Sequence, residues 1–398
     1  MRASRWILPF AGLVLWSLGC SDDDTSTAPH AKVGDDAGTD GSVLLPEAAQ
    51  ESSVVDAGHD VVDEQDAFFD APVDVAADQE EDAPIVVPKP TPADIDFKAL
   101  QPIPSGEFLL FNDWNPSPNM VRAISLDGQS VVDVFRAFRI WSLGVSHDSK
   151  RIAFACGDPK QAEHYDITLG DAIQHTWIYD VASQSAEVLA FGNLNDECHT
   201  FGPDDHNLYV CRRYDFSKTG SFKGWRIGRI DLSSRVFEFL TPEMDSVFAL
   251  HPQPTPDETE MLYGMIDIPS SPPAGVRSIK KLHFATETFS FVRTDADTPV
   301  LSPDGKRYLY QNFLQKRTLW ASSLDATNEV QVVAAEVTKP VWSPDGSRVA
   351  YLVRDDAHNC DHIEMVASDG SQASAPTRLR DCSTSGEFIT NIAWISIP

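Results

Sequence analysis

The sequence is poor in basic residues: 31 Lys and Arg stand against 60 Asp and Glu, which gives a formal net charge of −29. Such a surface repels polyanions, so the composition argues against nucleic-acid binding. After residue 20, no segment approaches the roughly 18 consecutive apolar residues of a membrane-spanning helix. The sequence also lacks Gly-x-Ser-x-Gly, His-Glu-x-x-His and a phosphate-binding glycine loop, which are signatures of hydrolases, zinc proteases and nucleotide-binding proteins.

Apolar content is nevertheless sufficient for a large core. Apolar residues make up 42% of the 398 residues, and aromatic residues, with nine Trp and 21 Phe, make up 10%. This composition excludes a wholly disordered chain. The length suits one large domain or two ordinary ones.

The first 19 residues predict an export signal. Arg2 and Arg5 precede an apolar run from Trp6 to Leu18, which is too short to span a bilayer as a helix. The run ends at Leu18-Gly19-Cys20, which resembles a bacterial lipobox, so residues 1–19 are interpreted as a lipoprotein signal peptide and Cys20 as the lipidated residue. Ordinary cleavage, with Cys20 incidental, is the alternative. Ser21 follows Cys20, and by the same resemblance this favours the outer membrane, on its periplasmic or its surface face.

Residues 20–96 predict a disordered acidic tether. Residues 21–96 contain 21 acidic residues and two lysines, and their apolar residues are mostly Ala and Val. Like charges repel and little apolar area is available for burial, so ordering entropy is not offset. The tether is expected to hold residues 97–398 away from the lipid surface.

A repeated phrase dominates the rest of the chain. Ser302–Tyr310 and Ser343–Tyr351 are near copies of Ser-Pro-Asp-Gly followed by a strand-like run. Pro presets φ, Asp bonds nearby amides and Gly accepts a positive φ, so each phrase predicts a hairpin turn. The aspartates of the five versions follow one another at intervals of 56, 53, 47 and 41 residues, at Asp148, Asp204, Asp257, Asp304 and Asp345. Units of this length with about four strands predict an all-β propeller.

Six units are expected, with the ring closed by the C-terminal strand. Gly106–Phe111 starts a first unit that lacks its innermost strand, and Phe388–Ile395 is a spare strand of that kind at the end of the chain. Trp394 in this strand matches Trp342, which precedes the last turn. Such closure would remove the exposed sheet edges of an open ring.

The repeat resembles that of TolB-type propellers, which are six-bladed and WD40-like, and more loosely that of prolyl-oligopeptidase-like propellers. The resemblance covers about residues 101–398 and implies a propeller fold, while the motif is diffuse for function, since such phrases occur in many unrelated roles. TolB proteins carry an α/β domain before the propeller, where this chain has the acidic tether. The hydrolase domain that accompanies oligopeptidase propellers is not expected, because no residues remain for it.

Five cysteines follow Cys20. Cys198 and Cys211 flank one turn symmetrically, and Cys360 and Cys382 flank another hairpin, so two disulfides are expected in an exported protein. Buried free thiols are the alternative. Cys156 is left over and is expected to be a buried thiol.

Binding residues are expected on the innermost strands and in two long insertions, residues 157–174 and 214–224. The inner strands should begin near Arg139, Glu197, Ser246, Asp297, Thr338 and Thr390. Cys198-His199 beside two acidic residues suggests zinc only weakly, since no second ligand pair is spaced to match it. The contact candidates are Trp114, His164, Tyr165, Glu197, His199, Tyr214, Asp297, Lys339 and Asn391.

The favoured interpretation is a monomeric, lipid-anchored propeller that binds a cell-envelope protein or peptide, without a cofactor or metal and without catalytic residues. The alternative is a metal-dependent polysaccharide lyase or hydrolase that uses the propeller axis. For that activity only Glu197, His199 and Asp297 are candidate metal ligands or catalytic groups.

Overall fold

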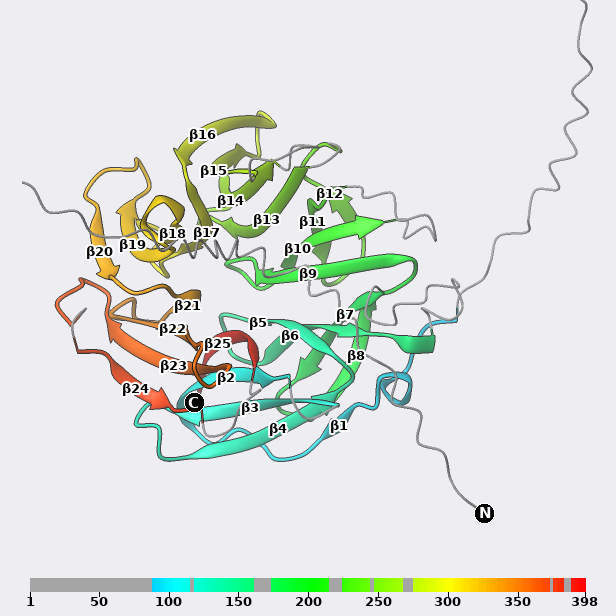
Figure 1. Cartoon of the computed structure of the whole chain (residues 1–398). Helices are drawn as coiled ribbons and strands as arrows, with labels where there is room; N and C mark the ends of the chain where they lie inside the picture. The colour runs from blue at the N-terminus through cyan, green and yellow to red at the C-terminus, as the bar shows by residue number, and fades with distance from the viewer. Residues whose placement is uncertain are drawn as a thin grey trace, which may run out of the picture. The chain divides into compact units, whose positions relative to one another are not determined.

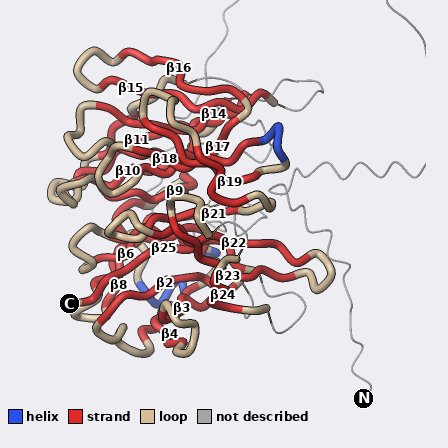
Figure 2. The backbone as a smooth tube through the Cα atoms, turned by 90° about the vertical axis from the view of Figure 1, so that its left-hand side faces the viewer, coloured by secondary structure: helices blue, strands red, loops and turns tan. Residues whose placement is uncertain are grey.

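The computed structural model of the chain is built from short antiparallel strands, as the sequence predicts (Figures 1 and 2). It also contains two 3₁₀ turns, η1 (Pro92–Ile95) and η2 (Phe313–Gln315). The structure describes residues 88–114, 118–160, 173–214, 224–243, 247–267, 275–372, 375–382 and 388–398. The predicted signal peptide, Cys20 and most of the predicted tether lie outside these residues. In the described residues, no helix is both long and apolar enough to cross a membrane.

The strands form five sheets, four of which consist of consecutive strands. The eight-stranded sheet contains β5 (Ile140–Val145), β6 (Arg151–Gly157), β7 (Gln174–Asp180), β8 (Ser185–Ala190), β9 (Leu194–Phe201), β10 (Asn207–Tyr214), β11 (Arg226–Asp231) and β12 (Phe237–Phe239). The next contains β13 (Val247–Pro254), β14 (Glu260–Asp267), β15 (Val276–His283) and β16 (Thr288–Thr294). Then come β17 (Ala296–Leu301), β18 (Arg307–Asn312), β19 (Thr318–Ser323) and β20 (Val330–Val333). The last of the four contains β21 (Thr338–Trp342), β22 (Arg348–Asp355), β23 (Cys360–Ala367) and β24 (Thr377–Arg380).

The fifth sheet joins the two ends of the ordered chain. Its order is β1-β4-β3-β2-β25, and it contains β1 (Lys98–Ala99), β2 (Gly106–Asp113), β3 (Asn119–Ser125), β4 (Val131–Ala137) and β25 (Ile389–Ile397). β25 pairs antiparallel with β2 along its length, from Gly106↔Ile397 to Asp113↔Ile389. The prediction that the C-terminal segment returns to the first sheet is therefore confirmed.

The eight-stranded sheet consists of two four-stranded meanders, β5–β8 and β9–β12. They are joined by one parallel pairing, between Gln174 of β7 and Asn195 of β9. The first strands of the two meanders and of the three four-stranded sheets, together with β25, contact one another in a ring. The cyclic order is β5, β9, β13, β17, β21, β25 and back to β5. We call these six strands the inner strands; Figure 1 shows several of them near the centre of the ordered body.

The repeated phrases form the predicted turns. In two of them, the hydroxyl of Ser302 or Ser343 donates to the aspartate two residues later, at 2.7 and 2.6 Å. The same hydroxyl accepts the amide of the strand that follows, at 2.9 Å in both cases. Gly305 and Gly346 have φ values of 68° and 69°, which other residues adopt with strain. Local chemistry therefore fixes each turn.

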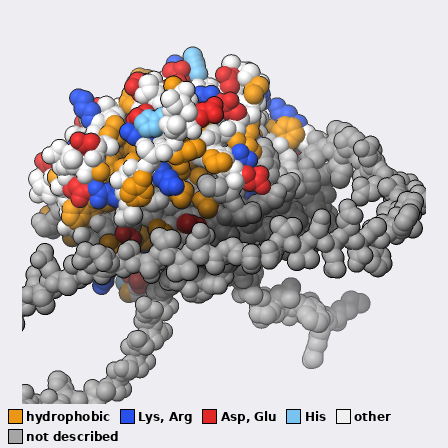
Figure 3. Space-filling model, turned by 90° about the horizontal axis from the view of Figure 1, so that it is seen from above, with side chains coloured by type: hydrophobic (Ala, Val, Ile, Leu, Met, Phe, Trp, Pro, Cys, Tyr) orange, Lys and Arg blue, Asp and Glu red, His pale blue; other side chains and the backbone are white. Residues whose placement is uncertain are grey.

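The core lies between neighbouring sheets. Leu109 and Phe111 of β2 pack with Ala350 and Ile363 of the β21–β24 sheet, so the first and last sheets share one apolar cluster. Ile95 of η1 is fully buried in another cluster. The packed body therefore takes in residues that the sequence analysis assigned to the end of the tether. Seen from above, acidic, basic and apolar side chains are intermixed on the described surface (Figure 3).

Candidate functional site

Four neighbouring inner strands carry the same irregularity. In β9, β13, β17 and β21 the pairing register slips, and one non-glycine residue there has a left-handed backbone. The φ values are 56° at Cys198, 55° at His251, 52° at Thr298 and 50° at Lys339. Such conformations cost of order 1–3 kcal/mol each, and they cluster at functional sites. β-Bulges also re-aim side chains, so this level of the inner strands is the candidate site.

Ionisable side chains of four inner strands lie close together at this level, with two further ionisable side chains from β10. We define the inner-strand cluster as Glu197, Cys198, Cys211, Arg213, His251, Asp297 and Lys339. Glu197 is within electrostatic reach of Lys339, Arg213 and His251, and His251 is within reach of Cys198, Asp297 and Lys339. All members except Cys211 and Asp297 are half-buried, so solvent reaches the cluster.

The cluster is more positive than its residue types suggest. Burial raises the pKa of Glu197 to about 8, and the negative charge of Cys198 adds to this rise, while Lys339 opposes it. Glu197 is therefore mostly protonated at neutral pH. Burial lowers the pKa of Arg213 to about 10, which leaves this guanidinium charged. A neutral acid thus stands beside basic groups.

Asp297 is held rigidly at the edge of the cluster. Its carboxylate accepts the Thr298 amide at 2.7 Å and pairs with Arg277 of β15. Gly264 of β14 faces this carboxylate without a side chain. The negative charge of Asp297 is therefore directed largely at Arg277.

The structure brings three of the predicted contact residues together: Glu197, Asp297 and Lys339 all belong to the inner-strand cluster. Asn391 is half-buried on β25, opposite Asn112 of β2. It lies three residues before Trp394, as Lys339 lies three residues before Trp342. Trp114 packs on Trp141 with ring centroids 4.5 Å apart. His164, Tyr165 and Ser246 lie outside the described residues. Tyr214 ends β10, where its backbone pairs with Leu194.

His199 lies apart from the cluster, in a buried network. Its Nδ1 is 2.6 Å from the Ser142 hydroxyl, and its Nε2 is 3.1 Å from the Thr176 hydroxyl. Thr176 donates to Asp196, which accepts two bonds from Arg212 at 2.6 Å. Burial lowers the pKa of His199 to about 4, so the ring is neutral. Both ring nitrogens are occupied and Ser142 is buried, so this serine–histidine contact is structural.

One of the two predicted disulfides is formed in this structure, and the other is not. Cys360 and Cys382 are bonded, with Cα atoms 5.8 Å apart. Cys198 and Cys211 are free. The turn symmetry suggested that they lie opposite each other, but the bulge places Glu197 opposite Cys211 and leaves Cys198 with a left-handed backbone. Cys156 is a buried free thiol, as predicted.

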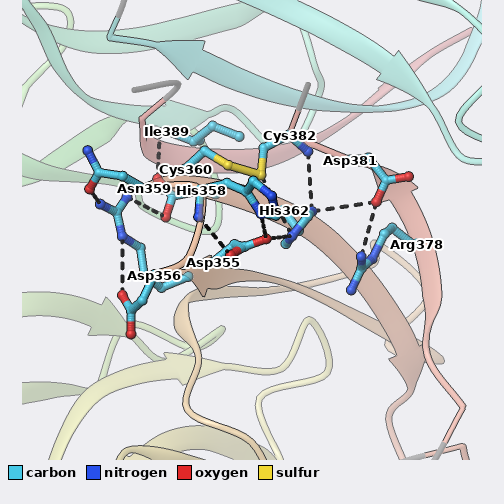
Figure 4. Close-up of a disulfide and its surroundings, with 12 residues drawn as sticks. Asp355, Asp356, His358, Asn359, Cys360, His362, Arg378, Asp381, Cys382 and Ile389 are labelled. Carbon is cyan, nitrogen blue, oxygen red and sulfur yellow. Dashed lines mark hydrogen bonds and ion pairs between the residues drawn. A yellow bond between two sulfur atoms is a disulfide. The ribbon is translucent and has the colours of Figure 1, made fainter. Parts of the chain in front are cut away.

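The disulfide lies within a second polar cluster (Figure 4). Asp355 Oδ2 is 3.3 Å from His362 Nε2 and 2.8 Å from His358 Nδ1, and the Cys382 amide donates to His362 Nδ1 at 3.2 Å. Among the described residues, Asp355, His362 and Cys382 are the group whose ligand atoms lie close enough for one metal ion. Because the Cys382 sulfur is bonded to Cys360, it has no thiolate to offer a metal.

A cavity of about 630 Å³ lies at the turns, away from the bulges. Its aspartates already serve the turns, since Asp148 accepts the Lys150 amide and Asp205 accepts the amides of His147 and Asp148. This use of their oxygens makes the cavity a weaker candidate than the inner-strand cluster. It is lined by Asp148, Arg151, Asp204, Asp205, His206, Asp231, Leu232 and Ser233.

Sequence reasoning missed His251, and it did not bring Cys198 together with Glu197 and Lys339. A signal was available: in three of the four irregular strands, a proline follows the left-handed residue, in His251-Pro252, Thr298-Pro299 and Lys339-Pro340. Proline inside a strand is confined to edges and bulges, so it marks the break in pairing. The proximity of His251 to Cys198 depends on packing between sheets and has no local signal.

No protein-family model matches the chain, and no curated protein matches it. Among solved structures, TolB from Acinetobacter baumannii is similar with a TM-score of 0.54 and 16% identity, over 75% of this chain and 68% of that one. A TolB protein from Agrobacterium tumefaciens gives 0.50 and 13%, over 74% and 100%. Hydrazine synthase of Kuenenia stuttgartiensis gives 0.55 and 10%, over 74% and 47%. At these identities the likeness establishes the TolB-type β-propeller fold alone, and the same fold serves unrelated functions.

Proposed function

We propose that this chain is a lipid-anchored propeller of the cell envelope that binds a protein partner at the inner-strand cluster. In this proposal residues 1–19 direct export, Cys20 carries the lipid at the outer membrane, and residues 20–96 form the acidic tether. Residues 97–398 then form six blades, with β25 completing the first. The cyclic contacts of the inner strands support this count.

The observation that carries the binding role is the repeated bulge, which presents strained, half-buried polar residues from four adjacent strands. Evolution retains such strain where a site needs a fixed geometry. The Ser142–His199 contact near this level is buried, and the Asp297 carboxylate is held by the Thr298 amide and by Arg277. The arrangement therefore suits recognition better than catalysis.

The charges indicate the partner's chemistry. Arg213 and Lys339 are basic, Glu197 is mostly protonated, and Asp297 is paired with Arg277. An acidic segment or a chain-terminal carboxylate would find complementary charge here, although the protein as a whole repels acidic partners. We therefore propose that the partner presents a carboxylate-bearing peptide to the inner strands.

Photo-cross-linking in cells tests this proposal. A photo-reactive residue at Asn391 should capture one envelope protein, whereas the same residue at the exposed Thr288 of β16 should not. Lys339→Glu should reduce capture from Asn391 at least tenfold, and Lys306→Glu, on an exposed turn, should leave it unchanged. Equal capture from both positions, or equal effects of the two charge reversals, would reject the inner strands as the binding surface.

Anchoring needs a separate test. Cys20→Ala should abolish incorporation of labelled palmitate and move the protein from the membrane to the soluble fraction of the cell envelope. Cys156→Ala is the matched control, because this cysteine is buried in the body and should not affect anchoring. Unchanged membrane association of Cys20→Ala would contradict the lipoprotein assignment while leaving the binding surface untouched.

A further inference from the structure

Two free thiols lie side by side within the inner-strand cluster. Cys211 of β10 is fully buried against Trp225, Phe248 and Leu250, and Cys198 of β9 packs on the same group while remaining half-buried. The Cys211 thiol hydrogen-bonds to Cys198. Cys198 is thus a partly exposed residue, and the buried Cys211 packs in the same cluster.

His251 lies against the more exposed thiol and hydrogen-bonds to it. Burial works against a thiolate at Cys198, but the hydrogen bond from Cys211 and the charge and hydrogen bonds of His251 together lower its pKa well below the ordinary value. Burial likewise opposes a charged His251, yet the negative charge of Cys198 raises the pKa of this imidazole, with help from Asp297. Each group therefore favours the charged form of the other.

The two cysteines are electrostatically unlike each other. Burial raises the pKa of Cys211 well above its ordinary value, and the neighbouring Cys198 raises it further. Cys211 is therefore the harder of the two thiols to ionise. Cys156 provides a contrast within the same chain, because it is fully buried and burial raises its pKa without an imidazole beside it. Thiolates rather than thiols are nucleophiles, so only Cys198 is activated among the three.

We propose that Cys198 and Cys211 form a redox-active dithiol that undergoes thiol–disulfide exchange with small or protein-borne disulfides. The Cys198 thiolate attacks one sulfur of the incoming disulfide, forms a mixed disulfide and releases one thiolate. This removes the negative charge beside Cys211, whose proton passes to the released thiolate. The Cys211 thiolate then attacks the Cys198 sulfur and expels the second thiolate, so the two cysteines lose two electrons and the incoming disulfide gains them.

Oxidation would also change the proposed binding surface. The charge on Cys198 contributes to the raised pKa values of Glu197 and His251. A Cys198–Cys211 disulfide carries no such charge, so Glu197 would ionise more readily and His251 would lose its proton more readily. The redox state of the pair would thereby set the charge offered to a carboxylate ligand. The exchange chemistry itself does not depend on the identity of that ligand.

The test uses the full chain with Cys20→Ser and the aromatic disulfide 5,5′-dithiobis(2-nitrobenzoate), after mild reduction that leaves Cys360–Cys382 intact. We expect rapid release of two chromophores per chain with no label retained. An ordinary thiol gains about two-hundred-fold in rate between pH 6 and 9, because its thiolate fraction rises by that factor. Cys198 should change less than about threefold over that range. His251→Gln should restore most of the ordinary pH dependence.

Variants separate the roles of the two thiols. Cys211→Ser should release one chromophore and retain the other as a stable mixed disulfide, detected by mass. Cys198→Ser should abolish the fast reaction. Cys156→Ser should leave the fast reaction unchanged. The wild-type pH profile needs no substitution, so a folding defect in a variant does not decide the outcome. An ordinary pH dependence in the wild type, or a fast reaction that survives Cys198→Ser, would overturn the proposal.

Discussion

The carboxylate of Asp297 occupies the space that a side chain on Gly264 would fill. A Cβ atom at Gly264 would lie 2.5 Å from Asp297 Oδ1, which is too close for two non-bonded atoms. Asp297 in turn pairs with Arg277 and accepts the Thr298 amide at 2.7 Å. Because Gly264 of β14 has no side chain, the Asp297 carboxylate of the neighbouring sheet can lie against this strand.

Gly264→Ala should therefore displace Asp297 and destabilise the protein by about 1–3 kcal/mol, the usual cost of overpacking. The free energy of unfolding, measured in urea, reports this cost. In an Asp297→Ala background the clash is absent, so the same substitution should cost less than about 0.5 kcal/mol. Equal costs in the two backgrounds would show that the Gly264–Asp297 contact does not limit the packing.

The pH dependence of stability should reveal the neutral form of Glu197. The pKa of Glu197 is raised from its ordinary value of 4.5 to about 8 in the folded protein. Between these two pH values the folded state therefore holds a proton that the unfolded state has lost. This contribution to stability is complete below about pH 4.5 and is lost as pH rises through 8. Glu197→Gln mimics the protonated acid at every pH.

Glu197→Gln should consequently be more stable than the wild type at pH 8.5, by about 1–2 kcal/mol once solvent screening of this half-buried group is counted. The difference should shrink progressively toward pH 4.5. Urea unfolding of both proteins at several pH values measures it, and groups common to both cancel. Glu287→Gln, at an exposed position between β15 and β16, is the matched control and should show no such trend. A difference that grows as pH falls would contradict the assignment.

The fold could be predicted from the sequence because its turns are encoded locally. Ser302 and Asp304 lie within one phrase, and their hydrogen bond follows from chain neighbours alone. The regular spacing of such phrases then implied repeated sheets, and the spare strand ending near Ile395 implied its partner at Phe108. These inferences needed turn chemistry and counting, without knowledge of how sheets pack.

The candidate site was only partly predictable, since it depends on packing between sheets. Glu197 and Lys339 were found by register, as residues near the starts of inner strands. Hairpin symmetry failed for Cys198 and Cys211, because the bulge in β9 shifts the pairing by one residue. His251 was missed because it approaches Cys198 across two sheets, 53 residues away in the sequence.

The Cys360–Cys382 disulfide should stabilise the body appreciably. It closes a loop with a sequence separation of 22, for which restriction of the unfolded chain contributes about 3 kcal/mol. The double substitution Cys360→Ala/Cys382→Ala should lower the free energy of unfolding by about that amount. Reduction of the wild type with dithiothreitol should have a similar effect, while the double variant should not respond to the reductant. A wild type that is equally stable in reductant would rule out this contribution.

The pairing of β25 with β2 should be essential for folding. Ile395 is fully buried in this strand, so Ile395→Ala should cost about 3 kcal/mol through lost burial and the cavity left behind. Val236, which is 62% exposed, is the matched control, and Val236→Ala should change stability by less than about 0.5 kcal/mol.

Removal of residues 388–398 tests the same pairing more severely. Without β25, the edge of β2 exposes unpaired backbone groups and the apolar residues that β25 covers, so the shortened chain should aggregate or unfold. A synthetic peptide of residues 388–398, added during refolding, should restore the circular dichroism spectrum and the monomer peak in size-exclusion chromatography. A peptide with Ile392→Asp and Ile395→Asp should fail, because both side chains are buried in the paired strand. If the shortened chain were monomeric and as stable as the full chain, β25 would be an accessory strand, and the proposed closure of the ring by this strand would be rejected.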